Sequence, residues 1–232
     1  MNINHNILLS KKDKIKNLIL PNKLSTELAY IVGVLAGDGN IFVRISKHDY
    51  RIKCVGNPKD EKEFYDNILG PLFKKVFNLD IDIKEQDSGT TYGFYSYSKA
   101  LVRYLSTIFE LPIGKKSNKL RIPKILKNNN QVIPFIRGVA DTDFCLTYKK
   151  KGKYPCITGS SDSKEFLKEI AHELRKLGFT FYETYDYKLL DKRLNKGFSL
   201  INRIEINGKN NLIQWLNRIG FWSPKHLKKI KK

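Results

Sequence analysis

Cysteine and histidine are scarce in this sequence, and neither is spaced as a set of metal ligands. The chain has 232 residues, of which three are cysteine (Cys54, Cys145 and Cys156) and four are histidine. An odd and sparse set of cysteines indicates buried, reduced thiols rather than a disulfide framework. The scattered histidines provide no zinc site and no histidine–metal nuclease motif.

Long apolar runs are also missing. No run approaches the roughly 20 residues of a membrane-spanning helix, and no signal peptide is visible. We therefore expect an intracellular protein without a membrane partner, and an organelle location stays open. The absence of an N-terminal cysteine and of a C-terminal His-Asn pair argues against protein splicing.

Acidic residues are outnumbered by basic ones. The chain has 43 Lys and Arg against 23 Asp and Glu, a formal net charge of +20. Such an excess on a globular chain indicates a polyanionic partner. With 41% hydrophobic residues the chain can bury a core, and its length allows one large domain or two small ones.

One stretch is present twice. Residues 29–40 read AYIVGVLAGDGN, and residues 135–144 read FIRGVADTDF. An offset of 105 residues aligns Asp38 with Asp143. Each copy is an apolar helical run that ends in a carboxylate, although a helix C-terminus already carries partial negative charge. Two such aspartates at equivalent places indicate a bound cation.

Small residues lie on one face of each predicted helix. Glycines four residues apart share a face and let a second backbone come very close. We therefore predict that the two helices pack against each other, which brings their terminal acids together. The predicted helix–helix interface consists of Gly33, Gly37, Gly138 and Thr142.

Alternating and amphipathic patterns follow both motifs in the same order. In the first half they predict strands over 41–46, 50–55, 79–85 and 92–98, and helices over 61–77 and 99–110. In the second half they predict strands over 144–148, 154–158, 179–187 and 199–207, and helices over 163–177 and 209–219.

The predicted fold class is α+β. We expect two pseudo-symmetric αββαββα domains, each an antiparallel four-stranded sheet with helices on one face, joined at the two motif helices. The expected organisation is a basic N-terminal extension (1–24), a first domain (25–114), a linker (115–131) and a second domain (132–232).

The repeated stretch resembles the signature of a known family. Residues 31–39, IVGVLAGDG, resemble the LAGLIDADG motif of homing endonucleases, and residues 136–144, IRGVADTDF, are similar to a second copy. The second copy departs from the pattern, because Phe144 stands where the family usually has glycine. The resemblance implies a single-chain, two-domain enzyme that cuts double-stranded DNA with divalent metal ions at a long, non-palindromic site. A chain with two motifs is expected to be a monomer.

The resemblance also implies the metal ligands. The carboxylates of Asp38 and Asp143 are expected to hold Mg²⁺, a hard cation that prefers oxygen, together with the carbonyls of Gly37 and Thr142. Mn²⁺ is the expected substitute, and Ca²⁺ is expected to support binding without efficient cleavage.

Two lysines match a catalytic position of the family. Lys99 and Lys209 directly precede the last helix of each repeat, where a basic residue is expected to orient water or stabilise charge on the phosphate. A plain phosphate contact is the alternative role. The family's further polar residue on the second strand is not evident, because Val55 and Ile157 fall near its place.

The free faces of the two sheets are the expected DNA-binding surfaces, since paired strands can lie in the major groove. Ordinary solvated strand residues are the alternative for any one position. The candidates are Arg44, Ser46, Lys47, Arg51, Lys53, Tyr95 and Tyr97 in the first half, and Tyr148, Lys150, Lys153, Tyr185, Tyr187, Lys188 and Arg203 in the second.

The residue after each motif acid predicts how each helix ends. Gly39 is expected to take a positive φ after the first helix. Phe144 is expected to run directly into a strand, with its ring partly buried near the helix pair. This departure favours a rival function, a cleavage-deficient descendant of the family that acts as an intron-splicing maturase or a DNA-binding regulator. The two retained acids favour cleavage.

Overall fold

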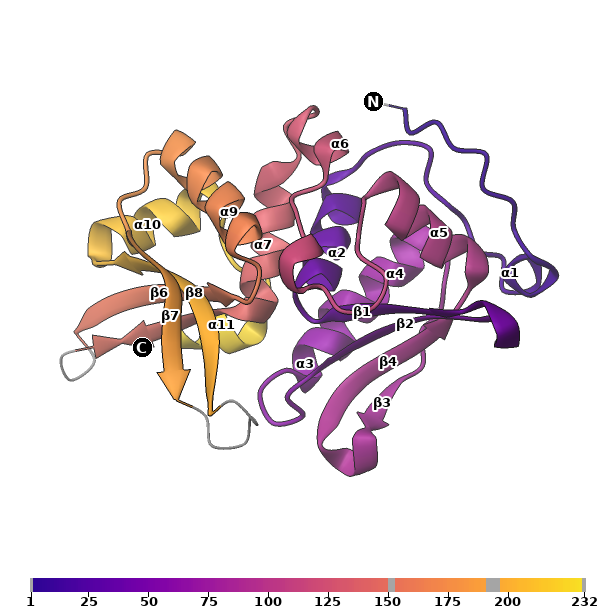
Figure 1. The fold of residues 1–232 in the computed structure, drawn as a ribbon, viewed down its shortest axis with the longest axis horizontal. Coiled ribbons are helices and arrows are strands. Elements are labelled where there is room, and N and C mark those ends of the chain that lie inside the picture. Colours follow the sequence, from indigo (N-terminus) through magenta and orange to yellow (C-terminus); the bar gives the residue numbers. More distant parts are fainter. Residues whose placement is uncertain (1, 150–152, 191–196, 231–232) are drawn as a thin grey trace.

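Helix α2 (Thr26–Gly37) opens the first repeat. Ser25 caps it, because its hydroxyl accepts a hydrogen bond from the Leu28 N–H at 3.1 Å, a contact of about 1 kcal/mol. Every residue from 28 to 36 is buried. A helix that is apolar all round belongs inside the molecule rather than on its surface, and α2 lies at its centre (Figure 1).

The computed structural model describes residues 2–149, 153–190 and 197–230. Both halves follow the predicted order of helix, two strands, helix, two strands and helix. After α2 the first half contains β1 (Gly39–Arg44), β2 (Asp49–Gly56), α3 (Lys62–Phe64), α4 (Gly70–Phe77), β3 (Ile83–Gln86), β4 (Thr91–Tyr97) and α5 (Lys99–Ile108). The second half contains α7 (Val132–Asp143), β5 (Phe144–Tyr148), β6 (Tyr154–Ser161), α9 (Lys164–Lys176), β7 (Tyr182–Leu190), β8 (Phe198–Asn207), α10 (Lys209–Arg218) and α11 (Pro224–Ile230).

The strands form two four-stranded antiparallel sheets, in the orders β1-β2-β4-β3 and β5-β6-β8-β7. Helices α2 and α7 lie side by side in the middle, with one sheet on either side and the remaining long helices on one face of each sheet (Figure 1). This arrangement confirms the predicted α+β fold of two similar αββαββα units. Because β1 and β4 both run antiparallel to β2, β1 and β4 are parallel to each other. The beginning of β1 and the end of β4 are therefore at opposite ends of the sheet.

One hydrophobic core runs through both halves. Inward-facing residues such as Ile52 and Phe94 in the first sheet, and Ile204 and Trp215 in the second half, are fully buried. Among the described residues no helix combines the length and the apolarity needed to cross a membrane.

Several elements differ from the sequence-based expectation. The helix predicted over 61–77 is interrupted by a π-helical turn at Tyr65–Leu69, just before the Gly70-Pro71 pair that predicted a kink. Strand β3 is shorter than predicted. Short helices also occur where none was specified: α1 (Lys11–Ile15) before the first repeat, α6 (Lys124–Lys127) between the repeats and α11 after α10.

Candidate active site at the junction of the two motif helices

Helices α2 and α7 pack backbone to backbone. A Cβ atom added to Gly33 would lie 2.1 Å from the Phe135 carbonyl oxygen, and one added to Gly138 would lie 2.2 Å from the Tyr30 carbonyl oxygen. A Cβ on Gly37 would similarly meet the Thr142 hydroxyl. Only residues without a side chain allow this approach. The four residues predicted for the interface therefore lie in it.

The close packing brings the two motif acids to one place. The position of a Cβ on Gly37, next to Asp38, is 3.3 Å from the Asp143 carboxyl carbon. Asp143 also lines a cavity of about 450 Å³ together with Lys116, Ser160 and Asp162. The carboxylates thus meet where the two helices end, beside a space that is open to solvent.

The two helices end differently. Asp38 follows α2 as its cap, whereas Asp143 is the last residue of α7 and Phe144 continues in extended conformation into β5. The expected positive φ of Gly39 is wrong, since Gly39 is not among the glycines with positive φ. Gly39 is needed for space instead, because a Cβ there would lie 2.5 Å from the Leu35 carbonyl oxygen.

The Phe144 ring is more deeply buried than predicted, and in a different place. It is 2% exposed and packs against Trp215 with ring centroids 5.9 Å apart. Gly159 on the neighbouring strand makes room for it, since a Cβ there would touch the ring. Phe144 therefore belongs to the core between the second sheet and α10 rather than to the helix pair.

Both motif acids resist ionisation. Burial, together with the negative charges of Asp143 and Glu61, raises the pKa of Asp38 to about 7. Burial also raises the pKa of Asp143 to about 6, against the lowering effect of Lys116 and Lys225. A cation bound between the two carboxylates would favour their ionised forms, so the site is suited to one.

Oxygen donors are available for such a cation. The described residues contain no group of three or more His, Cys, Asp or Glu side chains that could hold a metal ion. A metal here would therefore depend on the two carboxylates, backbone carbonyls and water. Such a set fits Mg²⁺, which usually keeps several waters.

Two lysines that sequence reasoning missed reach the site. Lys116 donates from Nζ to the carbonyl oxygen of Ala36 at 2.8 Å and also to that of Gly37. Lys225 donates to the Thr142 carbonyl oxygen at 3.2 Å. The carbonyls expected to bind the metal thus accept hydrogen bonds from lysines in this structure.

A signal for these lysines exists in the sequence. Lys116 follows the end of α5 by eight residues, and Lys225 follows the end of α10 by seven. The two lysines therefore occupy similar positions in the two repeats, shortly after the last helix of each unit.

Glu61, in the loop after β2, is a further acidic residue that sequence reasoning missed near the site. It forms an ion pair with Lys225, and the side chains are 10% and 17% exposed. Its second oxygen accepts the Asn57 N–H at 2.6 Å. Gly56 at the end of β2 makes room for this carboxylate, because a Cβ there would touch it. The carboxylate comes from the loop after the strand, so a search along the strand does not find it.

The structure does not bring Lys99 and Lys209 to the acids. Lys99 lies 5.4 Å from the centre of the Tyr50 ring, and Tyr50 is four residues along β2 from Cys54, the partner of Gly39. At about 3.3 Å per residue this is a separation of roughly 13 Å. The reason is the strand order, since the end of β4 and the beginning of β1 are at opposite ends of the sheet.

Lys209 is displaced in the same way. It follows Gly208, whose N–H donates to the Pro155 carbonyl at 2.9 Å, whereas Phe144 pairs with Gly159 at the other end of β6. Both lysines therefore lie at the ends of their sheets that are away from the motif acids.

The outer face of the first sheet carries the predicted DNA-contacting residues. Phe42 pairs with Arg51 and Arg51 with Tyr97, and Lys53 pairs with Tyr95, so these side chains share one face. Arg51 lies 4.4 Å from the centre of the Phe42 ring. Arg44 lies on the same face at the end of β1, and Ser46 and Lys47 lie in the turn Ile45–Lys47.

In the second sheet fewer of the residues predicted to contact DNA lie on the outer face. Arg203 pairs with Ser160 and Tyr187 with Ile201, which places both on the outer face. Lys153 lies in the exposed turn before β6. Lys150 lies outside the described residues.

Three residues of the second sheet that were predicted to contact DNA lie on the sheet face that the helices cover. Tyr148 and Tyr185 pack against the hydrophobic core, and Lys188 pairs with Leu200, one residue out of phase with Tyr187. Tyr148 shares the inward phase of Phe144. A register shift between Thr184 and Tyr187 moves Tyr185 inward, which simple alternation cannot predict.

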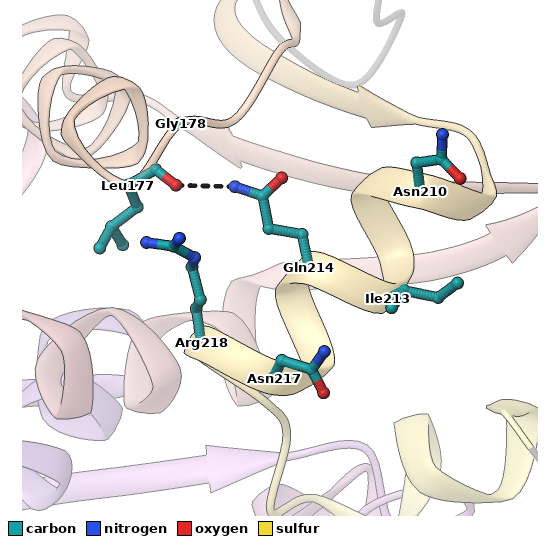
Figure 2. Close-up of a pocket in the computed structure, with 7 residues that line it drawn as sticks. All are labelled: Leu177, Gly178, Asn210, Ile213, Gln214, Asn217 and Arg218. Atoms are coloured by element: carbon teal, nitrogen blue, oxygen red, sulfur yellow. Dashed lines mark hydrogen bonds between the residues drawn. The ribbon is translucent and has the colours of Figure 1, made fainter.

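A separate hollow lies between α9 and α10 (Figure 2). It has a volume of about 580 Å³, and Gln214 at its edge donates to the Leu177 carbonyl at 2.7 Å. Its lining residues include no acid.

A comparison with protein families matches residues 130–220 to the LAGLIDADG-like domain. These residues include α7 with its terminal acid. The second half of the chain therefore matches a LAGLIDADG-like domain.

Solved structures of two homing endonucleases share the fold of the chain. I-DmoI in complex with DNA and Ca is similar with a TM-score of 0.62 and 19% identity, over 89% of this chain and 97% of that one. I-WcaI bound to its DNA recognition sequence is similar with a TM-score of 0.57 and 16% identity, over 95% and 92%.

Curated relatives are mostly much longer proteins. The replication factor C small subunit of Methanocaldococcus jannaschii is 28% identical over 98% of this chain, which spans 12% of that protein. A probable translation initiation factor IF-2 of the same organism is 29% identical over 91% of this chain and 17% of that protein. The chain thus spans less than a fifth of the length of these relatives.

Proposed function

We propose that this LAGLIDADG protein is a site-specific endonuclease that hydrolyses both strands of duplex DNA with divalent metal ions. The observation that carries the proposal is the meeting of Asp38 and Asp143 at the ends of two closely packed helices, with a lysine beside each helix end. The DNA-bound state of the I-DmoI and I-WcaI structures supports duplex DNA as the substrate.

The acids and the neighbouring carbonyls would hold the metal. Asp38 and Asp143 supply the charge, and the carbonyls of Gly37 and Thr142 become available once the lysine ammonium groups turn toward the DNA. When bound, the metal activates water and stabilises charge on the departing 3′-oxygen. Mg²⁺ is the proposed ion, with Mn²⁺ as its substitute, while Ca²⁺ supports binding only.

Lys116 and Lys225 replace the lysines expected from the sequence as the electrostatic stabilisers. Their side chains reach the helix ends from outside the two sheets. During attack on phosphorus, negative charge grows on the non-bridging oxygens, and a nearby ammonium stabilises it. Burial lowers the pKa of Lys116, so its ammonium group releases a proton more readily than that of a solvated lysine.

The sheets would position the substrate. The aromatic and basic side chains around Phe42, Arg51 and Lys53 face the same side as their counterparts Tyr187 and Arg203 in the second sheet. Two sheets of different sequence read two different half-sites, so the proposed target is non-palindromic and the proposed active form is a monomer.

The test combines selection of a binding site with a cleavage assay in Mg²⁺. Asp38→Asn and Asp143→Asn are each expected to abolish double-strand cleavage while DNA binding survives, because the carboxylates serve the chemistry and repel phosphate. Wild-type cleavage by both variants would place the chemistry elsewhere.

One observation favours the binding-only rival. In this structure the Gly37 and Thr142 carbonyls are occupied by lysines, and Glu61 neutralises Lys225. A maturase or DNA-binding regulator would retain these internal contacts on DNA. The same assay separates the two functions, since the rival binds the selected duplex and leaves it intact in both Mg²⁺ and Mn²⁺.

A further inference from the structure

The segment before the first repeat is a fixed part of the first domain. Ile3 and Leu18 are each 3% exposed. The backbone of Ile19 donates to the Phe77 carbonyl at 2.9 Å, and the Tyr104 hydroxyl donates to the Pro21 carbonyl at 2.7 Å. These contacts tie residues 2–24 to α4 and α5, so any side chains that the segment presents are held in place.

Its one acidic residue is turned inward. Asp13 is the only acid before residue 25, and it is fully buried. Its carboxylate accepts hydrogen bonds from the hydroxyls of Ser10 and Ser98, both at 2.6 Å. Ser98 in turn caps α5 by accepting the Leu101 N–H at 3.0 Å. The negative charge of Asp13 is therefore stabilised by hydrogen bonds inside the fold.

The lysines of the segment remain outside. Lys11 and Lys12 are exposed, and within the described residues neither forms an ion pair with an acid. Lys16 donates to the Tyr97 carbonyl at 3.2 Å and so fastens the end of α1 to the end of β4. Lys11 and Lys12 therefore present exposed positive charge on a short helix whose only acid, Asp13, is buried beneath them.

A hollow of about 440 Å³ lies between this segment and the sheet. It combines ammonium groups with tyrosine rings and a histidine. Its lining includes Lys11, Lys12, His48, Tyr50, Tyr97 and Lys99, together with the hydrogen-bonded carboxylate of Asp13. Tyr97 is 54% exposed and pairs with Arg51 on the outer face of the sheet, so this basic corner adjoins the proposed DNA-contacting surface.

The basic corner lies at the outer end of the first sheet. In Figure 1, α1 is next to the far end of the β1–β2 hairpin, on the side away from α2 and α7. A duplex that crosses both sheets with its cleavage site under the helix pair would leave the first sheet at this end.

We propose that the basic corner binds the sugar–phosphate backbone of the DNA flank, beyond the base pairs covered by the first sheet. The inference rests on the proposed function and extends the footprint of the same duplex. Ammonium groups and tyrosine hydroxyls donate to phosphate oxygens without reading bases. This contact therefore adds affinity and orientation but no sequence preference. Because the extension precedes only the first repeat, the footprint extends at one end only.

The test is hydroxyl-radical footprinting in Ca²⁺ on a duplex with long flanks around the site recovered by selection. The variant is Lys11→Gln combined with Lys12→Gln. The control is Lys74→Gln combined with Lys75→Gln, an adjacent exposed pair on the helix-side element α4. Both double variants remove the same charge, and thermal unfolding establishes that both fold.

Wild-type protein and the α4 control are expected to protect the flank next to the first domain, and the α1 variant is expected to lose that protection. The slope of log K against log salt is expected to become shallower by about 2 for the α1 variant alone, at about 0.9 per phosphate contact. Identical footprints and slopes for the two double variants would overturn the role of the basic corner while leaving the endonuclease proposal intact. Absence of any protected region with wild-type protein would overturn both.

Discussion

Replacing Gly33 by alanine tests whether the closeness of α2 and α7 supports both stability and cleavage. The new Cβ would lie 2.1 Å from the Phe135 carbonyl oxygen and 3.1 Å from the Gly138 Cα. Ordinary contacts between such atoms are about 3.5 Å. Both neighbours are backbone atoms of a buried helix, so the helices must separate by about 1 Å rather than rotate a side chain away.

The expected cost can be estimated from two opposing effects. Overpacking in a core costs about 1–3 kcal/mol or more, and alanine recovers up to about 1 kcal/mol through its higher helix propensity. The net loss of about 1–2 kcal/mol lowers the melting temperature by about 2–8 °C for a chain of this size. The acids lie five residues beyond Gly33 and Gly138, so the separation also displaces them. A displacement of about 1 Å costs on the order of 10²-fold in rate.

The assay is thermal unfolding by circular dichroism, together with cleavage at a temperature where every variant is folded. Gly70→Ala is the matched control, because its Cβ would meet only the mobile end of Ile83 at 3.0 Å and the Tyr65 carbonyl at 3.4 Å. The control should keep or slightly raise stability. A Gly33→Ala protein with wild-type melting and wild-type cleavage would refute the packing argument.

Further substitutions test the lysines and the buried histidine. Lys116→Met and Lys225→Met should each slow cleavage by about 10²–10³-fold in single-turnover assays, whereas Lys99→Met and Lys209→Met should change mainly DNA affinity; the reverse pattern would restore the original assignment. His226 is buried and stacked on Phe221 at 4.4 Å, and burial lowers its pKa from 6.5 to about 3, with Lys225 and Lys229 adding to the effect. Below about pH 6.5 this histidine is protonated in the unfolded chain but stays neutral in the folded chain. The free energy of unfolding therefore falls as the pH drops from about 6.5 toward 3, by up to about 1.4 kcal/mol per pH unit. His226→Phe should flatten this decline in urea unfolding measured across that pH range, and an unchanged decline would contradict the burial argument.

The architecture was predictable because it is encoded in local patterns that occur twice. The offset between Asp38 and Asp143 placed both motif helices. Small residues at matching positions predicted that those helices pack together, and alternation marked seven of the eight strands to within a few residues. These features depend on side-chain periodicity and size, which the sequence states directly.

The distance of each lysine from the motif acids could not be predicted by the same means. Lys99 was chosen for its position before a helix, but its distance from Asp38 depends on strand order, which no local pattern states. Lys116 lies outside regular structure, where periodicity provides no information. The predicted outward direction of Tyr185 was wrong for a related reason. One extra residue in a strand reverses the face on which each later side chain lies.

The glycine-lined contact between α2 and α7 has a consequence for the ends of a cut duplex. Asp38 and Asp143 are each attached to the end of a helix, and the close approach at Gly33 and Gly138 fixes the register of the two helices, because sliding would bring side chains against the facing backbone. In the proposed endonuclease, the spacing between the two scissile phosphates, and therefore the length of the single-stranded overhang, is set by this contact. The outer faces of the sheets select the sequence independently of it. Redesign of strand residues such as Arg51 or Arg203 would then change which DNA is cut and leave the overhang unchanged.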